Sequence, residues 1–394
     1  MTDAISKKIA GYMQKGSWIR RMFEEGDVLK AKFGKDNVFD FSLGNPMGEP
    51  PAAFKQAIRD ALDDPAPGQH GYMPNAGYPH VRNKLAEVLS RDHGVSLSGK
   101  DLIMTVGAAG AMNVALKAIL NPGDKVMIFA PYFVEYVFYA DNAGGQVVVV
   151  ETDADFNLNP AAIEAAMEPS VRALIINTPN NPTGRIYSMD VLQDVGAIVD
   201  RKSKEYGRPI YILSDEPYKR ITYGIDPPSL FHISTNTLVC TSYSKELVIP
   251  GERLGYVAVN PVCGNREEII NALTFCNRIL GFVNAPALMQ RALYRDPDDR
   301  VSIEGYRTNR QLLLDGLGSM GYEIVPPEGA FYLFPKSPIE DEVAFTEELK
   351  KENILVVPGR GFGRAGYFRI SYCVTQELIQ RSLPGFKRAI DRVN

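Results

Sequence analysis

Short apolar segments alternate with longer helical patterns through the middle of this chain. Seven such segments run over residues 101–106, 125–129, 146–150, 173–177, 210–214, 237–240 and 255–259. Helical patterns separate several of them, as at 109–120 and at 189–206, where apolar residues recur with helical spacing. Continuously apolar strands that alternate with helices are typical of a parallel sheet buried on both faces. We therefore expect an α/β fold in which a mainly parallel seven-stranded sheet is flanked by helices.

The stretch that begins near residue 300 shows a different order of elements. One long helical pattern is followed by short strand patterns at 322–325, 329–334 and 367–372, and then by a closing helix. This order is typical of an α+β unit. A chain of 394 residues is long enough for two domains. We expect a large domain over 47–297 and a smaller α+β domain over 298–394, completed by an N-terminal arm over 1–46.

Composition and charge limit the classes of partner. The net charge of −4 gives no reason to expect binding to nucleic acid or to an anionic membrane. No apolar run is long enough for a membrane span or a signal peptide, so we expect a cytoplasmic protein. The four cysteines lie far apart and the four histidines form no paired pattern, so we expect buried, reduced thiols and no metal site.

A single segment, residues 241–256, carries a lysine in a setting that suits covalent chemistry. Lys245 follows the hydroxyls of Ser242 and Ser244 and precedes Arg253. A lysine that acts as an amine nucleophile needs a sheltered site that lowers its pKa. Serine hydroxyls and an arginine suit a bound phosphate, which a guanidinium grips with two hydrogen bonds. The segment indicates pyridoxal 5′-phosphate (PLP) held as a Schiff base, although a solvated surface lysine would also fit it.

Other polar residues follow the predicted strands, at the edge where open α/β sheets bind ligands. Small residues at 107–111 open a helix, whose free N–H groups suit a phosphate. Prolines and a glycine fix the loop around Asn181. Asp215 ends a buried strand, and the ring nitrogen of PLP would supply the cation that a buried carboxylate needs. Tyr218 lies three residues further on and could donate a hydrogen bond to the ring oxygen. Each feature alone is also compatible with a tight turn or a helix cap.

An arginine lies inside an apolar strand pattern near the C-terminus. Arg369 shares one face of the segment 366–373 with Ser371 and Cys373, while apolar side chains take the other face. Such an arginine is either paired structurally or waits for an anion. The carboxylate of a substrate is the natural ligand for its two parallel donors.

In this order and spacing, these segments resemble the class I/II aminotransferases of the aspartate aminotransferase (fold-type I) superfamily. The resemblance also takes in residues 41–46, 72–82 and 358–359, and so covers nearly the whole chain. It implies a PLP-dependent enzyme that moves an amino group from an L-amino acid to a 2-oxo acid such as 2-oxoglutarate by a ping-pong mechanism.

The resemblance assigns most of the candidate residues to the cofactor. It implies that Lys245 forms the Schiff base and later shuttles the substrate's proton, that Asp215 pairs with the ring nitrogen, and that Asn181 and Tyr218 contact the ring oxygen. Phe133 matches the residue that stacks on the ring, with Tyr132 as the alternative. The implied phosphate ligands are Ala108, Ala109, Ser242, Ser244 and Arg253.

The resemblance also implies how substrate is bound and how subunits assemble. Arg369 would bind the substrate's α-carboxylate, helped by Asn181 and by the backbone at Gly44. Tyr72 resembles a tyrosine that reaches the phosphate in the neighbouring subunit, which implies a homodimer with shared sites.

The preferred substrate and some alternatives stay open. Ala109 stands where many bacterial aspartate aminotransferases carry a lysine that selects a second carboxylate, so aromatic or neutral amino acids compete with aspartate as donors. Arg278 is a candidate for selecting the side chain from the partner subunit, although a structural or surface role also fits. The alternatives in function are a PLP-dependent C–S lyase that β-eliminates, and a PLP-binding regulator, for whose DNA-binding domain the residues before Phe41 leave no room.

Overall fold

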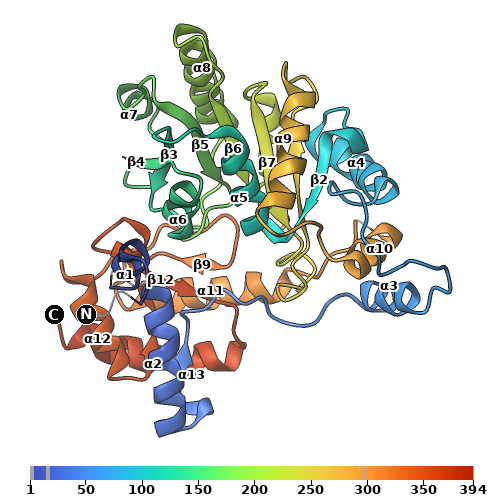
Figure 1. The fold of residues 1–394 in the computed structure, drawn as a ribbon. Helices are drawn as coiled ribbons and strands as arrows, with labels where there is room; N and C mark the ends of the chain where they lie inside the picture. The colour runs from blue at the N-terminus through green and yellow to red at the C-terminus, as the bar shows by residue number, and fades with distance from the viewer. Residues whose placement is uncertain (1–3, 15–17, 297, 394) are drawn as a thin grey trace.

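The computed structural model describes residues 4–14, 18–296 and 298–393. At its centre lies a seven-stranded sheet (Figure 1). In spatial order the strands are β2 (Leu102–Thr105), β8 (Gly255–Val259), β7 (Thr237–Ser242), β6 (Tyr211–Asp215), β5 (Val171–Asn177), β3 (Lys125–Ala130) and β4 (Gln146–Glu151). Strand β8 runs in the opposite direction to the other six strands of this sheet, so its pairs with β2 and β7 are antiparallel. The expected α/β fold with a mainly parallel seven-stranded sheet is confirmed.

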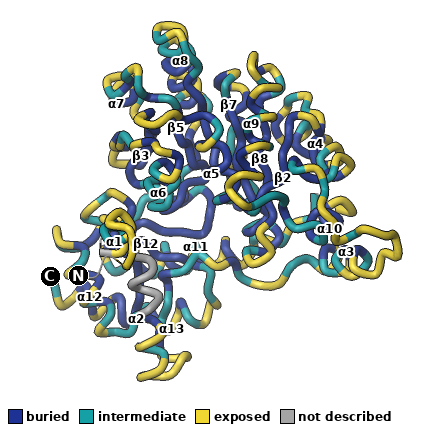
Figure 2. The backbone as a smooth tube through the Cα atoms, in the orientation of Figure 1, coloured by how far each residue is buried: buried dark blue, intermediate teal, exposed yellow. Residues whose placement is uncertain are grey.

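Helices cover both faces of the sheet because its central strands are apolar on both faces. Helices α5 (Gly107–Ile119), α6 (Glu135–Asn142) and α9 (Arg266–Ile279) pack on one face, and α7 (Pro160–Ala165) and α8 (Met189–Glu205) on the other. Ile175 and Leu213 belong to the hydrophobic cluster under α5 and α9, whereas Leu174 and Ile212 belong to the cluster under α8. This alternation follows from the two-residue period of a strand. Figure 2 shows the resulting buried centre.

A third group of helices covers the β2 end of the sheet. These are α3 (Ala52–Leu62), α4 (Pro79–His93) and α10 (Ala287–Arg295). Phe54, Leu85 and Met289 from these helices pack with Met104 of β2 in one hydrophobic cluster. Short 3-10 helices lie at Lys35–Asn37, Gly99–Asp101, Leu230–His232 and Gly359–Phe362.

The C-terminal part of the chain builds a separate core around small sheets. Strands β11 (Val357–Pro358), β12 (Phe368–Ser371) and β9 (Tyr332–Leu333) form an antiparallel sheet in that order, and β1 (Phe39–Asp40) pairs in parallel with β10 (Ile354–Leu355). Helices α11 (Glu304–Ser319), α12 (Glu342–Lys350) and α13 (Gln376–Asp391) surround them. Phe41, Phe331, Phe345 and Phe386 are fully buried in the shared aromatic cluster.

Two details of this part differ from the sequence prediction. The segment 322–325 is not a strand, because it leads into Pro326 and Pro327, which lack the N–H groups that a ladder needs. Helix α12 was not expected, although Asp341 caps it by accepting hydrogen bonds from Val343 N and Ala344 N. The division into domains at residues 46 and 297 stays a prediction.

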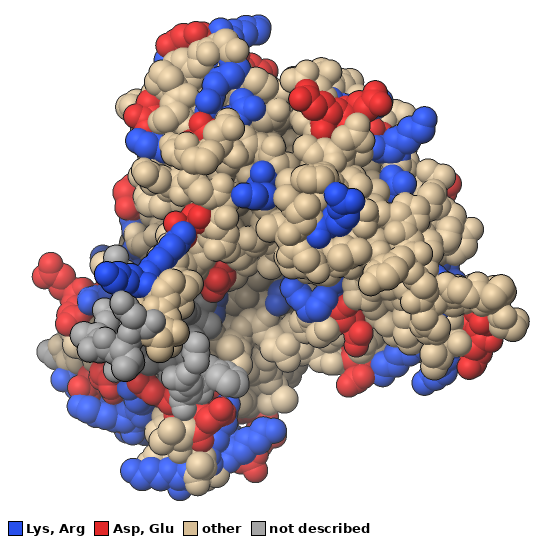
Figure 3. Space-filling model, viewed as in Figure 1, with Lys and Arg blue, Asp and Glu red and all other residues tan. Residues whose placement is uncertain are grey.

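The N-terminal segment contributes α1 (Lys7–Gln14) and α2 (Trp18–Phe33). Helix α1 lies against α6, where the rings of Tyr12 and Phe138 are 4.9 Å apart and Lys8 pairs with Asp141. Figure 3 shows scattered basic and acidic side chains on one face of the molecule, with broad uncharged areas between them. No helix among the described residues is both long and apolar enough to cross a membrane.

Candidate active site

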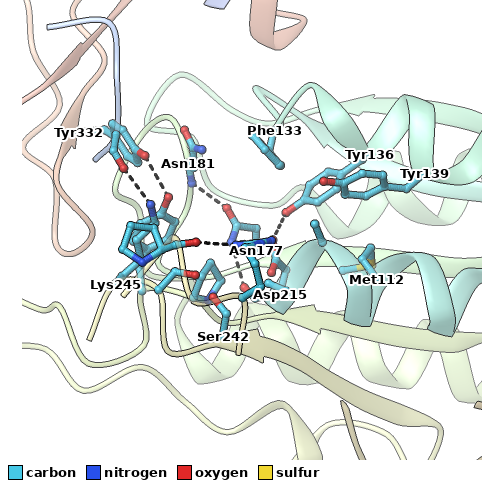
Figure 4. A pocket seen from close by; sticks show the side chains of 18 of the residues that line it. Met112, Phe133, Tyr136, Tyr139, Asn177, Asn181, Asp215, Ser242, Lys245 and Tyr332 are labelled. Atoms are coloured by element: carbon cyan, nitrogen blue, oxygen red, sulfur yellow. Dashed lines mark hydrogen bonds between the residues drawn. The ribbon is translucent and has the colours of Figure 1, made fainter. Parts of the chain in front are cut away.

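One cavity of about 300 Å³ lies at the C-terminal ends of the parallel strands (Figure 4). It brings together residues that are far apart in the sequence. Its lining includes these predicted site residues: Gly44, Ala108, Ala109, Phe133, Asn181, Asp215, Tyr218, Ser242, Ser244, Lys245, Arg253 and Arg369. Twelve of the predicted positions therefore meet in one place, as expected for strand ends of an open α/β sheet.

Lys245 has the sheltered setting that the sequence predicted. Its Nζ atom donates a hydrogen bond to the carbonyl oxygen of Gly44 at 2.8 Å and lies 5.5 Å from the centre of the Phe331 ring. Burial lowers the pKa of Lys245 to about 8, and the charges of Arg369 and Arg253 act in the same direction. A usable fraction of neutral amine is therefore present near neutral pH, as a nucleophile requires.

Asp215 is a buried carboxylate at the end of β6. Its Oδ2 atom accepts a hydrogen bond from the Tyr136 hydroxyl, and its backbone oxygen accepts one from Asn177 Nδ2 at 2.9 Å. Burial raises the pKa of Asp215 to about 7, which the Tyr136 hydrogen bond opposes and the Glu216 charge reinforces. Among the described residues no lysine or arginine forms an ion pair with Asp215, so a cationic group in the cavity would relieve the cost of its burial.

The loop after β5 places Asn181 over the strand ends. The Asn181 backbone N–H donates to Asn177 Oδ1 at 2.7 Å, so the last residue of β5 fixes the loop. The Asn181 side-chain oxygen accepts a hydrogen bond from Arg369 at 3.0 Å. Asn177, which fixes this loop, also contacts Asp215, so the loop links the end of β6 to the Arg369 guanidinium.

The start of α5 and the loop after β7 together form a site suited to an anion. Arg253 donates to the carbonyl oxygens of Pro250 at 2.9 Å and Val106 at 3.3 Å, which brings its guanidinium over the first turn of α5. Gly107 has a φ of 77°, and a Cβ there would lie 2.9 Å from the guanidinium. The free N–H groups of α5, the guanidinium and the buried Ser242 and Ser244 hydroxyls all favour negative charge.

Arg369 is held rigidly but has a free donor. It is 2% exposed and donates to Asn181 Oδ1 and, at 2.6 Å, to the Ser42 carbonyl oxygen. The Tyr332 and Phe362 rings lie 4.6 Å and 4.8 Å from its guanidinium carbon. Its buried Nε has no hydrogen-bond partner among the described residues. A buried unpaired donor on a cation is suited to an anionic ligand such as a carboxylate.

Phe133 and not Tyr132 lines the cavity. The Tyr132 backbone N–H donates to the Phe362 carbonyl oxygen at 2.9 Å, and the Tyr132 ring lies so close to Gly363 that a Cβ there would overlap it. Tyr132 therefore belongs to the contact with the 3-10 helix at Gly359–Phe362.

Several lining residues were not predicted from the sequence: Met112, Tyr136, Tyr139, Asn177, Pro217, Pro250 and Tyr332. A signal existed for two of them. Tyr136 and Tyr139 follow Phe133 at intervals of three residues, a spacing that indicates one side of a helix, although α6 itself begins only at Glu135. The sequence held no comparable signal for Tyr332, which reads as one more apolar strand residue.

Tyr72 and Arg278 lie away from the cavity. Tyr72 is 94% exposed, beside a surface recess that residues 70–73 and 282–285 line. Arg278 lies on α9, with its guanidinium 5.1 Å from the centre of the Phe275 ring. Both predicted roles need a partner subunit and stay predictions.

Known proteins resemble the chain over nearly its whole length. The family described as aminotransferase class I and II matches residues 36–384. The aspartate/prephenate aminotransferase of Thermus thermophilus is 35% identical over 89% of this chain and 90% of its own. An aminotransferase structure from Eubacterium rectale superposes with a TM-score of 0.96 at 38% identity, covering 99% of each chain. The structure of the Thermus thermophilus aspartate aminotransferase with maleate superposes with a TM-score of 0.88 at 30% identity, covering 98% of this chain and 100% of that chain.

Proposed function

The chain belongs to the class I and II aminotransferase family, and we therefore propose that it moves an amino group from an L-amino acid to a 2-oxo acid such as 2-oxoglutarate. The reaction would run as two half-reactions, with the donor's 2-oxo product leaving before the acceptor binds. One observation carries the proposal: a sheltered lysine, a buried carboxylate and a buried arginine with a free donor line the same cavity.

The residues present fit PLP as the cofactor. Asp215 would hold the protonated ring nitrogen, and Asn181 and Tyr218 would hold the ring oxygen. Phe133 would cover the ring, while Lys245 would hold the cofactor covalently. The phosphate would bind to the start of α5 at Ala108 and Ala109, to Ser242 and Ser244, and to Arg253. PLP supplies the electron sink that makes an amino acid's α-proton acidic.

The chain's own groups would bind the substrate and move its proton. Arg369 would take the α-carboxylate through its free donors, because its position is already fixed by Asn181 and Ser42. The Lys245 amine, with a pKa near 8, would accept the α-proton and return it. The Gly44 backbone, against which Lys245 rests, would close this end of the site.

The lining of the cavity near Ala109 bears on the donor's side chain. The relative in Thermus thermophilus is named for aspartate and prephenate. In this chain Ala109 adds no charge to the cavity, and Met112, Phe133 and Tyr139 line it nearby. We propose aspartate, aromatic and neutral amino acids as the donors to be compared.

We also propose a cytoplasmic homodimer with shared sites. The support is the strong exposure of Tyr72 and of apolar residues on α9, with Phe275 at 52% and Ile279 at 51% exposed. In such a dimer Tyr72 would reach the partner's phosphate site, and Arg278 would lie near the interface.

Steady-state assays of the PLP-loaded protein test the proposal. Each amino acid is supplied with and without 2-oxoglutarate, and glutamate, ammonia and pyruvate are measured. An aminotransferase forms glutamate only when the 2-oxo acid is present. Release of ammonia and pyruvate without an acceptor would identify a lyase and contradict the proposal.

A further inference from the structure

Tyr332 contacts both Tyr218, which the proposed function assigns to the cofactor, and Arg369, which it assigns to the substrate. It is 2% exposed and lies on β9, at the end of the cavity where Figure 4 shows Lys245 and Asn181. We propose that Tyr332 is a positioning residue for amino transfer: its hydroxyl orients Tyr218, and its ring orients Arg369. This inference rests on the proposed function.

The role proposed for Tyr218 sets the direction of the hydrogen bond between the Tyr218 and Tyr332 hydroxyls, either of which could donate. The oxygens of Tyr218 and Tyr332 are 2.9 Å apart, and their rings cross at 82°. Burial raises the pKa of Tyr332 to about 12 and that of Tyr218 well above its usual value, so both phenols keep their protons at neutral pH. A phenol has a single proton to donate. When Tyr218 gives its proton to the ring oxygen of PLP, Tyr332 must donate to Tyr218.

That direction makes Tyr332 part of a hydrogen-bond relay. Its donation polarises the Tyr218 O–H bond and strengthens the bond that Tyr218 makes. The relay stabilises negative charge on the ring oxygen. It therefore favours the form of the PLP-loaded enzyme in which the ring oxygen carries a full negative charge, and so lowers the pH at which that form appears.

The ring contact acts on the substrate side. The Arg369 guanidinium carbon lies 4.6 Å from the centre of the Tyr332 ring, within the range of a cation–π interaction. Two hydrogen bonds and the Phe362 ring hold the other sides of this guanidinium. Removing the Tyr332 ring would let the guanidinium turn and would misplace its unpaired Nε donor.

A third contact leaves Tyr332 little freedom to move. A Cβ at residue 44 would overlap the Tyr332 hydroxyl, so the Gly44 backbone lies directly against it. The carbonyl oxygen of Gly44 accepts the hydrogen bond from Lys245 Nζ. The tyrosine is thus braced by the backbone that holds the reactive lysine.

The hydroxyl role is tested by a pH titration of the visible absorbance of the PLP-loaded protein. The quantity measured is the midpoint pH of the absorbance change. Tyr332→Phe should raise this midpoint by about half a pH unit, because the charged ring oxygen loses support. Tyr218→Phe should raise it at least as far. The double variant should match Tyr218→Phe alone, because Tyr332 acts through Tyr218.

The ring role is tested by comparing KM with kcat for the best amino donor of the wild type. Tyr332→Leu should raise KM on the order of tenfold, because it removes the cation–π partner of Arg369. Tyr332→Phe keeps the ring and should leave KM near the wild-type value. Circular dichroism and thermal unfolding establish that the Leu variant is folded.

Tyr223→Phe is a matched control. The Tyr223 and Tyr372 hydroxyls form a similar, partly buried pair at 3.2 Å outside the cavity lining, so this variant should change neither the absorbance midpoint nor KM. The proposal is overturned if Tyr332→Phe leaves the midpoint unchanged, if the double variant is additive, or if Tyr332→Leu leaves KM unchanged. A wild type that neither takes up PLP nor converts any amino acid would instead contradict the proposed function itself.

Discussion

The hydroxyl of Tyr136 donates a hydrogen bond to Oδ2 of Asp215, so the first turn of α6 holds the carboxylate at the end of β6. Burial raises the pKa of Asp215, and this hydrogen bond lowers it by a smaller amount. The resulting pKa is about 7. The carboxylate is therefore poised to ionise when a cationic ring nitrogen arrives. In the proposed function, Tyr136 would support the cofactor through Asp215.

Tyr136→Phe should weaken PLP binding by about tenfold near neutral pH, because a smaller fraction of Asp215 is then ionised. The loss should shrink as the pH is raised and Asp215 ionises in the variant too. Equilibrium titration with PLP at several pH values measures both effects. Tyr187→Phe, at a buried tyrosine outside the cavity, should bind PLP like the wild type. Equal affinity of Tyr136→Phe at all pH values would contradict this role.

Asp215→Asn should stabilise the PLP-free protein at alkaline pH. The pKa of Asp215 is about 7 in the folded chain and 3.8 in its unperturbed state. The unfolded chain therefore loses this proton first, and stability falls as pH rises from about 4 to about 7, then stays level. By this linkage the variant should gain up to roughly 4 kcal/mol over the wild type at pH 8 and nothing near pH 3. Urea unfolding at both pH values measures the difference, and a pH-independent difference would rule the effect out.

Arg220→Met should destabilise the protein by about 3 kcal/mol. Arg220 pairs with Asp92, with Glu246 at 3.1 Å and with Asp298 at 2.7 Å, and so joins the Lys245 segment to α4 and to the segment before α11. Burial already raises the pKa of Glu246 to about 7, an effect that Arg220 opposes.

Urea unfolding measures this loss, and adding Glu246→Gln should recover part of it by removing the stranded carboxylate. Arg91→Met is the matched control, because Arg91 is 63% exposed and contacts the same Asp298 at 3.4 Å. It should change stability by less than about 0.5 kcal/mol. Equal losses of stability in the two arginine variants would show that burial of the Arg220 ion pairs does not contribute to the stability of the protein.

Ala109→Lys should shift donor preference towards aspartate. The new ammonium group would enter the cavity from the first turn of α5 and offer a cation to a second carboxylate. The ratio of kcat/KM for aspartate to that for phenylalanine should rise on the order of tenfold. Ala118→Lys places the same charge on α5 outside the cavity lining and should leave the ratio unchanged.

The fold was predictable where the signal is local. The seven strands of the large sheet follow from continuous apolar runs, and residues such as Asp215 and Asn181 could be placed because strand ends of a parallel sheet meet at one edge. The segment 322–325 was misassigned because its apolar residues suggest a strand, while Pro326 and Pro327 prevent one.

The rest of the site depends on contacts between distant segments. Tyr332 lies 114 residues from Tyr218, and nothing in its own segment indicates that they touch. The choice between Tyr132 and Phe133 depends on the turn at Gly363, which takes the Tyr132 ring and leaves Phe133 to face the cavity.

The most direct test follows the absorbance of the PLP-loaded protein as single amino acids are added without any acceptor. We predict that at least one of aspartate, phenylalanine, alanine and methionine converts the bound cofactor to its pyridoxamine form, and that adding 2-oxoglutarate then restores the starting spectrum. In Lys245→Ala, neither the conversion to the pyridoxamine form nor the return of the starting spectrum should occur at a measurable rate. Full conversion and return in Lys245→Ala, or no conversion in the wild type with any amino acid, would contradict the proposed amino transfer through Lys245.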